Sequence, residues 1–151
     1  MRDLLITIFL SLAPFTELRG GIPYGLAAGL DFSLVFIVAV LANILIIFPI
    51  FFFLDNIHKY LTNWSFYNKV FNKFLVRAKK KVEKKIGTNW EFIALLLVVA
   101  IPFPGTGAYT GCLASWAFKL KRKKSLLAIS LGVIVAGIIT SLVSLGLISL
   151  I

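Results

Sequence analysis

The chain has 151 residues, of which 60% are hydrophobic and 15% are charged. A water-soluble domain carries about 25% charged residues, so this composition excludes the common soluble classes and indicates an integral membrane protein. The formal net charge of +10 does not indicate nucleic-acid binding, because fourteen of the sixteen basic residues lie in two segments, residues 55–91 and 119–124. Basic loops beside apolar spans mark the cytoplasmic side of a membrane, so we expect both segments to be cytoplasmic.

The first predicted element covers residues 4–31, which are mostly apolar apart from "PFTELRGGIP" (14–23) near the middle and Asp31 at the end. This segment has 28 residues, too few for two membrane-spanning helices of about 20 residues each. We therefore expect a re-entrant hairpin, in which two half-helices enter from the outside, turn at Pro14 and the "RGGIP" segment, and return. The alternative is a single kinked helix over residues 4–23, which would leave Glu17 and Arg19 near a membrane surface.

Residues 33–54 and 125–151 contain no charged residue and supply 22 and 27 consecutive positions, enough for a membrane-spanning helix in each case. Pro49 predicts a kink in the first span. Asn43 lies in the middle of the same span, where its amide could bond a hairpin tip or a substrate, or could be purely structural.

Residues 57–86 predict an amphipathic helix that lies on the cytoplasmic surface of the membrane and ends at Gly87. Apolar residues recur on one face mostly at three- and four-residue steps, and basic residues line another face. The expected apolar face consists of Ile57, Leu61, Trp64, Phe71, Leu75, Val82 and Ile86, and the basic face of Lys69, Lys73, Arg77, Lys80 and Lys84.

Residues 92–118 are apolar but are interrupted by "PFPGTG" (102–107). Both flanking segments are strongly basic, so the chain must leave the cytoplasmic side and return to it within 27 residues. We expect a second re-entrant hairpin, which turns at Pro102–Gly107 near the middle of the membrane.

The two halves of the chain resemble each other, which indicates a repeat over residues 1–54 and 92–151 joined by residues 55–91. The shared features are a Pro-Phe pair and glycines four residues apart, at Pro14, Phe15, Gly25 and Gly29 and at Pro102, Phe103, Gly107 and Gly111. A hairpin followed by one span crosses the membrane an odd number of times, so the second copy must be inverted. The predicted fold is a single all-α integral membrane domain built as an inverted repeat, an architecture typical of secondary transporters.

Glu17 and Arg19 are the only charged residues in the two hairpin tips. An ionisable group deep in a membrane usually marks a transport pathway or a proton site. Arg19 could hold a phosphate or carboxylate, and Glu17, whose neutral form burial would favour, could take up and release a proton. The alternative is a structural ion pair that only fixes the turn.

The second tip has no charge but offers backbone amides at a half-helix N-terminus, which attract anions, and three hydroxyl groups. The predicted substrate- and proton-binding residues are Glu17, Arg19, Gly20, Gly21, Asn43, Pro102, Pro104, Gly105, Thr106, Gly107, Tyr109 and Thr110. The predicted turn and packing residues are Pro14, Pro23, Gly25, Gly29 and Gly111. His58 and Cys112 have no catalytic partners in the sequence, so we expect no enzyme active site, metal or cofactor.

The motifs "ELRGGIPYG" (17–25) and "PFPGTGAYTG" (102–111), with the basic segment between them, resemble the small multidrug export protein family. That family is regarded as a distant relative of the DedA/VTT-domain membrane proteins. The resemblance covers essentially the whole chain and implies two opposed re-entrant hairpins with a tip acid and arginine, matched here by Glu17 and Arg19. DedA relatives are implicated in moving polyprenyl phosphates or other phospholipids and in proton-dependent tolerance to drugs. DedA proteins proper are longer and carry further acidic residues absent here.

The first functional hypothesis is a proton-linked transporter or flippase for an anionic, phosphate-bearing lipid, with Arg19 on the headgroup and Glu17 carrying the proton. The second is an exporter of small amphipathic cations, in which Glu17 is the counter-ion and Arg19 its resting partner. A third is a membrane scaffold, for which neutralising Lys79–Lys81 matters and Glu17→Gln does not. We expect a homodimer in the plasma membrane with both termini outside and with lipid and protons, not nucleic acid, as partners.

Overall fold

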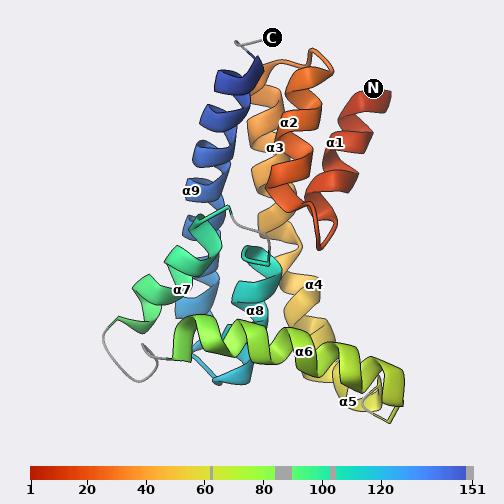
Figure 1. The fold of residues 1–151 in the computed structure, drawn as a ribbon, viewed down its shortest axis with the longest axis vertical. Coiled ribbons are helices and arrows are strands. Elements are labelled where there is room, and N and C mark those ends of the chain that lie inside the picture. The colour runs from red at the N-terminus through yellow and green to blue at the C-terminus, as the bar shows by residue number, and fades with distance from the viewer. Residues whose placement is uncertain (62, 84–89, 103–104, 149–151) are drawn as a thin grey trace.

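The computed structural model describes residues 1–61, 63–83, 90–102 and 105–148, and every regular element in these ranges is a helix. Phe103, Pro104 and the segment 84–89, with the expected helix end at Gly87, lie outside the described residues. The long axis of the molecule is set by two long helices, with shorter helices packed beside them and one helix lying across one end (Figure 1).

The chain begins with two short helices, α1 (Arg2–Leu12) and α2 (Glu17–Ala27), that lie side by side and are joined by a tight turn. They approach closely because α2 presents glycines to α1: a Cβ atom on Gly21 would lie 1.9 Å from Ser11 Oγ, and one on Gly25 would lie 2.9 Å from Thr7 Oγ1. A single kinked helix over residues 4–23 is therefore wrong, because the chain reverses direction before Glu17.

The turn lies at residues 13–16, so the expectation that "RGGIP" contributes to it is also wrong. Gly20, Gly21 and Pro23 lie inside α2. Glycine and proline suggest a turn from local preference alone, but here the glycines meet the packing demand of a neighbouring helix, which allows close approach only to small residues.

The first long helix runs from Phe32 to Leu61. It consists of α3 (Phe32–Leu45), α4 (Ile47–Phe52), the π-helical segment η1 (Phe53–Ile57) and α5 (His58–Leu61). Asp31 caps its start, since the Asp31 carboxylate accepts a hydrogen bond from the Leu34 amide at 3.1 Å. The regular helix is interrupted at Ile46, near the kink predicted from Pro49, because proline cannot donate to the carbonyl four residues earlier.

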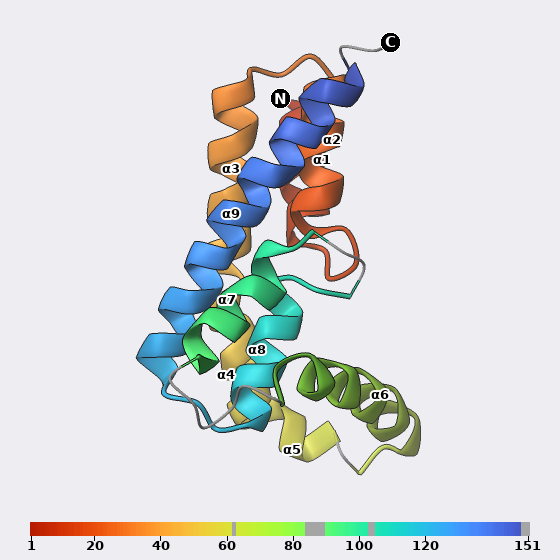
Figure 2. The same ribbon diagram turned by 60° about the vertical axis from the view of Figure 1, so that its left-hand side comes forward.

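The basic helix α6 (Ser65–Val82) lies across one end of the molecule (Figures 1 and 2). The expectation of one amphipathic helix over residues 57–86 is thus correct for the middle of the segment and wrong at its start. Ile57 belongs to the long helix. Trp64 has an extended backbone and immediately precedes α6, so it lies in neither helix. The inward face of α6 includes Ala78 and Val82, which are buried.

The second half repeats the order of the first, with two short helices followed by a long one. Helices α7 (Glu91–Ala100) and α8 (Ala108–Ala117) form the pair, and α9 (Arg122–Ile148) is the long helix. Gly111 of α8 packs tightly against α7, where an added Cβ atom would lie 2.6 Å from Val99 Cγ2. The turns of the two helix pairs point toward each other near the middle of the molecule (Figure 2).

Two of the described helices are long and apolar enough to cross a membrane, Phe32–Leu61 and Arg122–Gly146. Their outward faces are exposed and apolar, with Leu41 and Leu45 on the first and Ile138 and Leu142 on the second. Helix α9 contacts α2, α3, α7 and α8 and so joins both halves around one buried core. The N-terminus of α1 and the end of α9 lie at one end of the molecule, and α6 lies at the other (Figure 1).

Candidate functional site

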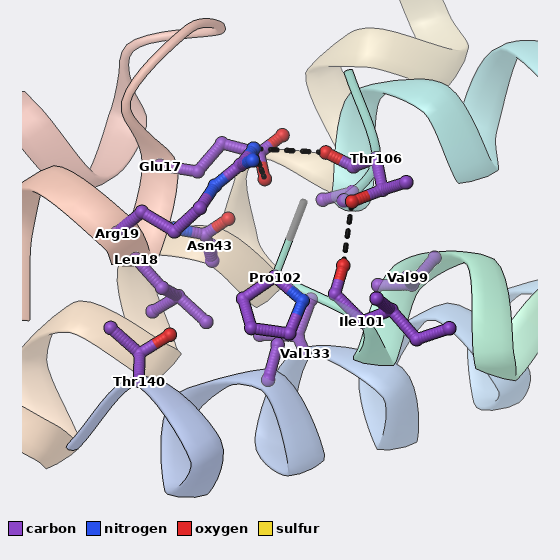
Figure 3. A pocket seen from close by; sticks show the side chains of 13 residues that line it. Glu17, Leu18, Arg19, Asn43, Val99, Ile101, Pro102, Thr106, Val133 and Thr140 are labelled. Carbon is purple, nitrogen blue, oxygen red and sulfur yellow. Dashed lines mark hydrogen bonds and ion pairs between the residues drawn. The ribbon is translucent and has the colours of Figure 1, made fainter. Parts of the chain in front are cut away.

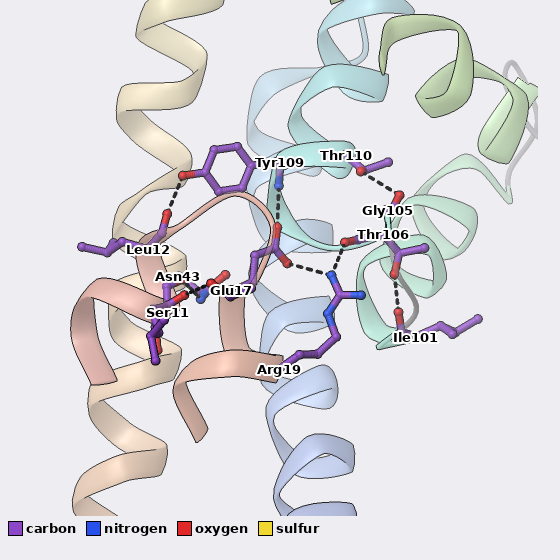
Figure 4. A network of polar contacts seen from close by, with 12 residues as sticks. Ser11, Leu12, Glu17, Arg19, Asn43, Ile101, Gly105, Thr106, Tyr109 and Thr110 are labelled. Atoms are coloured by element: carbon purple, nitrogen blue, oxygen red, sulfur yellow. Dashed lines mark hydrogen bonds and ion pairs between the residues drawn. The ribbon is translucent and has the colours of Figure 1, made fainter. Parts of the chain in front are cut away.

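The centre of the candidate site is the carboxylate of Glu17, the first residue of α2. Glu17 is 5% exposed and has a φ of 47°, which is unusual for a residue other than glycine. Its Oε1 atom accepts a hydrogen bond from the Tyr109 amide at 3.4 Å, across the gap between the two turns (Figure 4). A strained backbone at a buried acid is a pattern found at functional sites.

Arg19, two residues further along α2, also contacts both turns. Its Nη2 atom lies 3.9 Å from Glu17 Oε2 and donates to the Thr106 carbonyl at 3.1 Å. The Arg19 side chain is 22% exposed against 7% for Glu17, so the arginine lies nearer open space and the carboxylate lies deeper. A buried carboxylate needs this kind of partner, because burying an isolated charge is very costly.

Gly107 fits against the carboxylate so closely that no other residue could replace it without movement. A Cβ atom at this position would lie 1.8 Å from Glu17 Oε2, and the φ of Gly107 is +118°. Helix α8 begins at the next residue, so its positive N-terminal end faces the Glu17 carboxylate. The backbone amides here were predicted to bind a substrate anion, but the Tyr109 amide donates its hydrogen bond to Glu17.

The hydroxyl groups of the second tip donate to backbone carbonyls. Tyr109 bonds the Leu12 carbonyl at 2.6 Å, Thr106 bonds Ile101 at 2.6 Å, and Thr110 bonds Gly105 at 3.0 Å (Figure 4). These carbonyls lie at or beyond helix ends, where the helices leave backbone acceptors without partners. Tyr109 therefore joins the second tip to the end of α1.

Asn43 lies within this centre, as predicted, and is 1% exposed. Its Nδ2 atom donates to the Ser11 carbonyl at 2.6 Å, which joins α3 to α1. The Asn43 Oδ1 atom has no hydrogen-bond partner within the described part of the chain. Asn43 therefore has the structural role that the sequence left open, through its Nδ2 atom, and this role does not involve its Oδ1 atom.

Two basic residues that sequence reasoning did not place at the site come from α6. The Lys81 ammonium donates to the Gly105 carbonyl, and Arg77 lines a cavity beside Gly105 and Thr106. Partial burial and the positive charges of Arg19 and Arg77 lower the pKa of Lys81, so these three cations lie near one another. The only sequence signal was that Arg77 and Lys81 are four residues apart, and nothing there placed α6 against the second tip.

Three cavities meet around the two turns. The smallest lies at Glu17 and Arg19, and the centre of a water molecule can occupy about 10 Å³ of it (Figure 3). It shares Thr106 with a cavity of about 310 Å³ on the α6 side, which has an aromatic wall. It shares Arg19, Pro102 and Thr140 with a cavity of about 430 Å³ on the opposite side, which Pro23 and Ser144 also line.

The remaining predicted residues lie outside this centre. Pro14 is in the first turn, and Gly25 and Gly111 pack against neighbouring helices as expected. Gly29 lies in the turn between α2 and α3 with a φ of +78°, and an added Cβ atom would meet nothing within 4 Å, so its predicted packing role is wrong. Gly20 and Gly21 face other parts of the first helix pair, namely Thr16 and Ser11.

Comparison with known proteins identifies a family. The sequence profile of the family described as "Putative small multi-drug export protein" matches residues 17–139. The matched range begins at Glu17, just after the first turn, and includes α2, α6, the second helix pair and most of α9. No curated protein and no solved structure matches the chain.

Proposed function

This chain belongs to the small multi-drug export protein family, and we propose that it moves small amphipathic molecules outward across a membrane in exchange for protons. The observation that carries the proposal is the buried Glu17 carboxylate, which lines a small cavity that shares wall residues with a larger cavity on either side. A carboxylate between two cavities can bind a proton or a cationic group in turn, which is what exchange requires.

The proposed cargo is a small amphipathic cation, the second of the two transport hypotheses that the sequence raised. The cavity on the α6 side has the wall that such a cargo needs, because Phe15, Tyr67, Phe71, Phe74 and Tyr109 line it. Aromatic rings attract cations by their faces and offer apolar contact to the rest of the molecule. Arg19 is the resting partner that the cargo displaces from Glu17.

The proposed mechanism uses neutralisation of Glu17 to open the contact between the turns. The charged carboxylate attracts the α8 N-terminus and Arg19 at once. When a proton or a bound cation neutralises Glu17, both attractions weaken. The ion pair then no longer holds the Arg19 guanidinium in the position from which it donates to the Thr106 carbonyl. The two turns can then separate, which opens Glu17 to either the 310 Å³ cavity or the 430 Å³ cavity, one at a time.

The proposed membrane architecture is an inverted repeat of a re-entrant hairpin and a spanning helix. Helix lengths support it: α1 and α2 have 11 residues each and α7 and α8 have 10, so each rises only about 15–17 Å, half of a hydrocarbon core of about 30 Å. The basic α6 would lie on the cytoplasmic side and both ends of the chain outside. We further propose a homodimer in the plasma membrane, since so few helices enclose the site.

A second candidate cargo is the anionic lipid of the first hypothesis, which one observation favours. Arg19, Arg77 and Lys81 gather near Gly105 and Thr106, and together with Glu17 they leave an excess of positive charge there. Guanidinium groups of this kind bind phosphate well. The two cargos differ in charge, so a transport assay separates them.

The test compares Glu17→Gln with Glu83→Gln in proteoliposomes that carry a pH gradient, because Glu83 is an exposed carboxylate at the end of α6. The wild type and Glu83→Gln are expected to move ethidium against its gradient as protons move the other way, and Glu17→Gln is expected to move neither. Movement of a labelled anionic phospholipid without ethidium transport would favour the second candidate. Unchanged transport by Glu17→Gln would overturn the role of this carboxylate.

A further inference from the structure

Thr140 of α9 and Asn43 of α3 carry polar atoms that the described structure leaves without partners. Thr140 Oγ1 and Asn43 Oδ1 are both buried, with their residues 6% and 1% exposed, and neither forms a hydrogen bond to any described residue. Both side chains line the small cavity that holds Glu17 and Arg19 (Figure 3). Buried polar atoms are nearly always hydrogen-bonded, so two orphaned oxygens around one cavity indicate that something polar binds between them.

The size of the cavity selects the ligand. About 10 Å³ is open to the centre of a water molecule, which is room for one ordered water and for nothing much larger. Such a water can accept from the Thr140 hydroxyl, donate one proton to Asn43 Oδ1 and keep its second proton for the Glu17 carboxylate. Thr140 also lines the cavity of about 430 Å³ on the side of the chain termini, together with Arg19 and Ser144. Thr140 therefore stands at the boundary between Glu17 and that larger space.

We propose that Thr140 and Asn43 bind a water molecule that passes protons between Glu17 and the 430 Å³ cavity, which is itself filled with water. This inference rests on the proposed function, which requires that Glu17 exchange a proton. It adds the route that the proton takes and the two residues that form the route. The cargo and the proton then use different sides of Glu17. The amphipathic cargo comes from the aromatic cavity beside α6, and the proton comes from the opposite side through Thr140.

The groups around Glu17 fit a proton route on that side. Its own helix supplies Arg19, and α8 supplies Tyr109 and Cys112, which interact electrostatically with Glu17. Arg77 and Lys81 of α6 lie on the side of the aromatic cavity. Helices α3 and α9 present only uncharged residues to the small cavity. Among the described residues that line the larger cavity, Arg19 is the charged one, so a proton that arrives past α9 passes one cation instead of the Arg77 and Lys81 of the opposite side.

Thr140→Val is the test substitution, because valine keeps the shape of threonine and removes the hydroxyl. The matched control is Ser141→Ala, which removes a neighbouring buried hydroxyl that also has no partner among the described residues but lines neither cavity. Proton uptake during ethidium export is read with a pH-sensitive dye, and ethidium binding is measured separately at equilibrium. We expect Thr140→Val to slow proton uptake about fivefold, the effect of one lost hydrogen bond, with ethidium binding unchanged. Thr140→Ser, which keeps the hydroxyl, should restore the rate.

A second arm tests the water-filled cavity without any transport. In a Cys112→Ala background, Val143→Cys and Leu142→Cys are treated with a charged, membrane-impermeant thiol reagent from the side of the chain termini. Both positions are exposed, at 57% and 66%, but only Val143 lines the 430 Å³ cavity. We expect Val143→Cys to react and Leu142→Cys, which faces lipid, to stay unlabelled.

The outcomes separate the two proposals. If the wild type moves neither ethidium nor protons, the proposed function fails, and the labelling arm alone decides whether the cavity holds water. If the wild type transports and Thr140→Val behaves like Ser141→Ala, the Thr140 route is wrong while the proposed function stands. Absence of labelling at Val143→Cys would overturn the water-filled cavity.

Discussion

Single residues decide how the two turns of the molecule fit together, and among the described glycines Gly107 leaves the least room for an added Cβ atom, because the Glu17 carboxylate lies against it. The glycine has a backbone conformation that other residues avoid, and its missing side chain leaves the space that the carboxylate fills. The carboxylate in turn accepts the Tyr109 amide. The position of the acid and the start of α8 are therefore set by one another.

Gly107→Ala is expected to destabilise the protein and to displace the Glu17 carboxylate. Backbone strain alone costs about 1–3 kcal/mol, and forcing a methyl group into occupied space costs about 1–3 kcal/mol more. Gly29→Ala is the matched control, because its φ is also positive but its added Cβ atom meets nothing within 4 Å. The free energy of unfolding, followed by tryptophan fluorescence in detergent, should fall clearly further for Gly107→Ala. Equal losses for the two variants would mean that the clash with Glu17 is relieved at no cost.

The sequence was sufficient to identify the charged residues of the site but not the residues that lie next to them in space. Glu17 and Arg19 stood out because they are charged residues in apolar surroundings, and the structure brings them together with Thr106, Gly107 and Tyr109. Thr140 gave no signal, because a threonine in a long apolar helix usually bonds its own backbone. Its importance depends on which helices surround it, and that information is not local.

Whole elements are positioned by a few aromatic contacts, and α6 shows this most clearly. Phe71 of α6 lies 4.0 Å from the His58 ring of α5 and 6.2 Å from the Trp116 ring of α8, measured between ring centroids. Phe74 of α6 reaches Phe15 of the first turn at 6.5 Å. These contacts place α6 over the aromatic cavity, so the helix is part of the wall of that cavity and not only a linker.

Phe71→Ala is expected to lower the free energy of unfolding by about 2–3 kcal/mol, below the cost for a fully buried phenylalanine because Phe71 is only half-buried. Phe66→Ala removes the same side chain from an outward position of the same helix, where it is 77% exposed, and should change stability little. Chemical unfolding in detergent, where membrane anchoring by the two phenylalanines does not contribute, checks both. A similar loss for both variants would argue that α6 is held by the membrane rather than by α5 and α8.

The periodicity of α6 was readable from the sequence, but its start and its docking were not. Phe71, Leu75 and Val82 were predicted to share a face, and all three are at least partly shielded. Trp64 was placed on the same face and is 70% exposed. The pattern failed there because helical spacing continues through Leu61 and Trp64 while the backbone changes direction between them.

At the scale of the whole molecule, the arrangement predicts a definite topology. Both ends of the described chain lie opposite α6 (Figure 1), and α6 carries much of the positive charge. A fluorescent protein inserted between α5 and α6 is therefore expected to fluoresce in the cytoplasm, and alkaline phosphatase fused after α9 to be active outside. Activity of both reporters on the same side of the membrane would contradict the proposed topology.

The order of the elements was predictable because composition and length constrain membrane helices strongly. Apolar segments of 28 and 27 residues cannot cross twice. Length together with the basic flanking segments predicted a helix pair at residues 92–118, whereas at residues 4–31 length left a single kinked helix open as the alternative. Which residues form the turns did not follow, because Gly20 and Gly21 are equally suited to a turn and to a close helix contact. Only the position of α1 beside α2 distinguishes the two uses.

The packing of α9 has a consequence for how the protein is made. Helix α9 is synthesised after α2, α3, α7 and α8, all of which it contacts. Until it arrives, the short helices lack the partner that covers them, and the cavity at Glu17 lacks the wall that Val133, Ala136 and Thr140 of α9 form. The nascent chain must therefore hold its first hairpin unfinished at the translocon while more than half of the sequence is still being translated. Closure of the Glu17 cavity therefore waits for α9, and a chain truncated before α9 would leave exposed the residues that α9 buries.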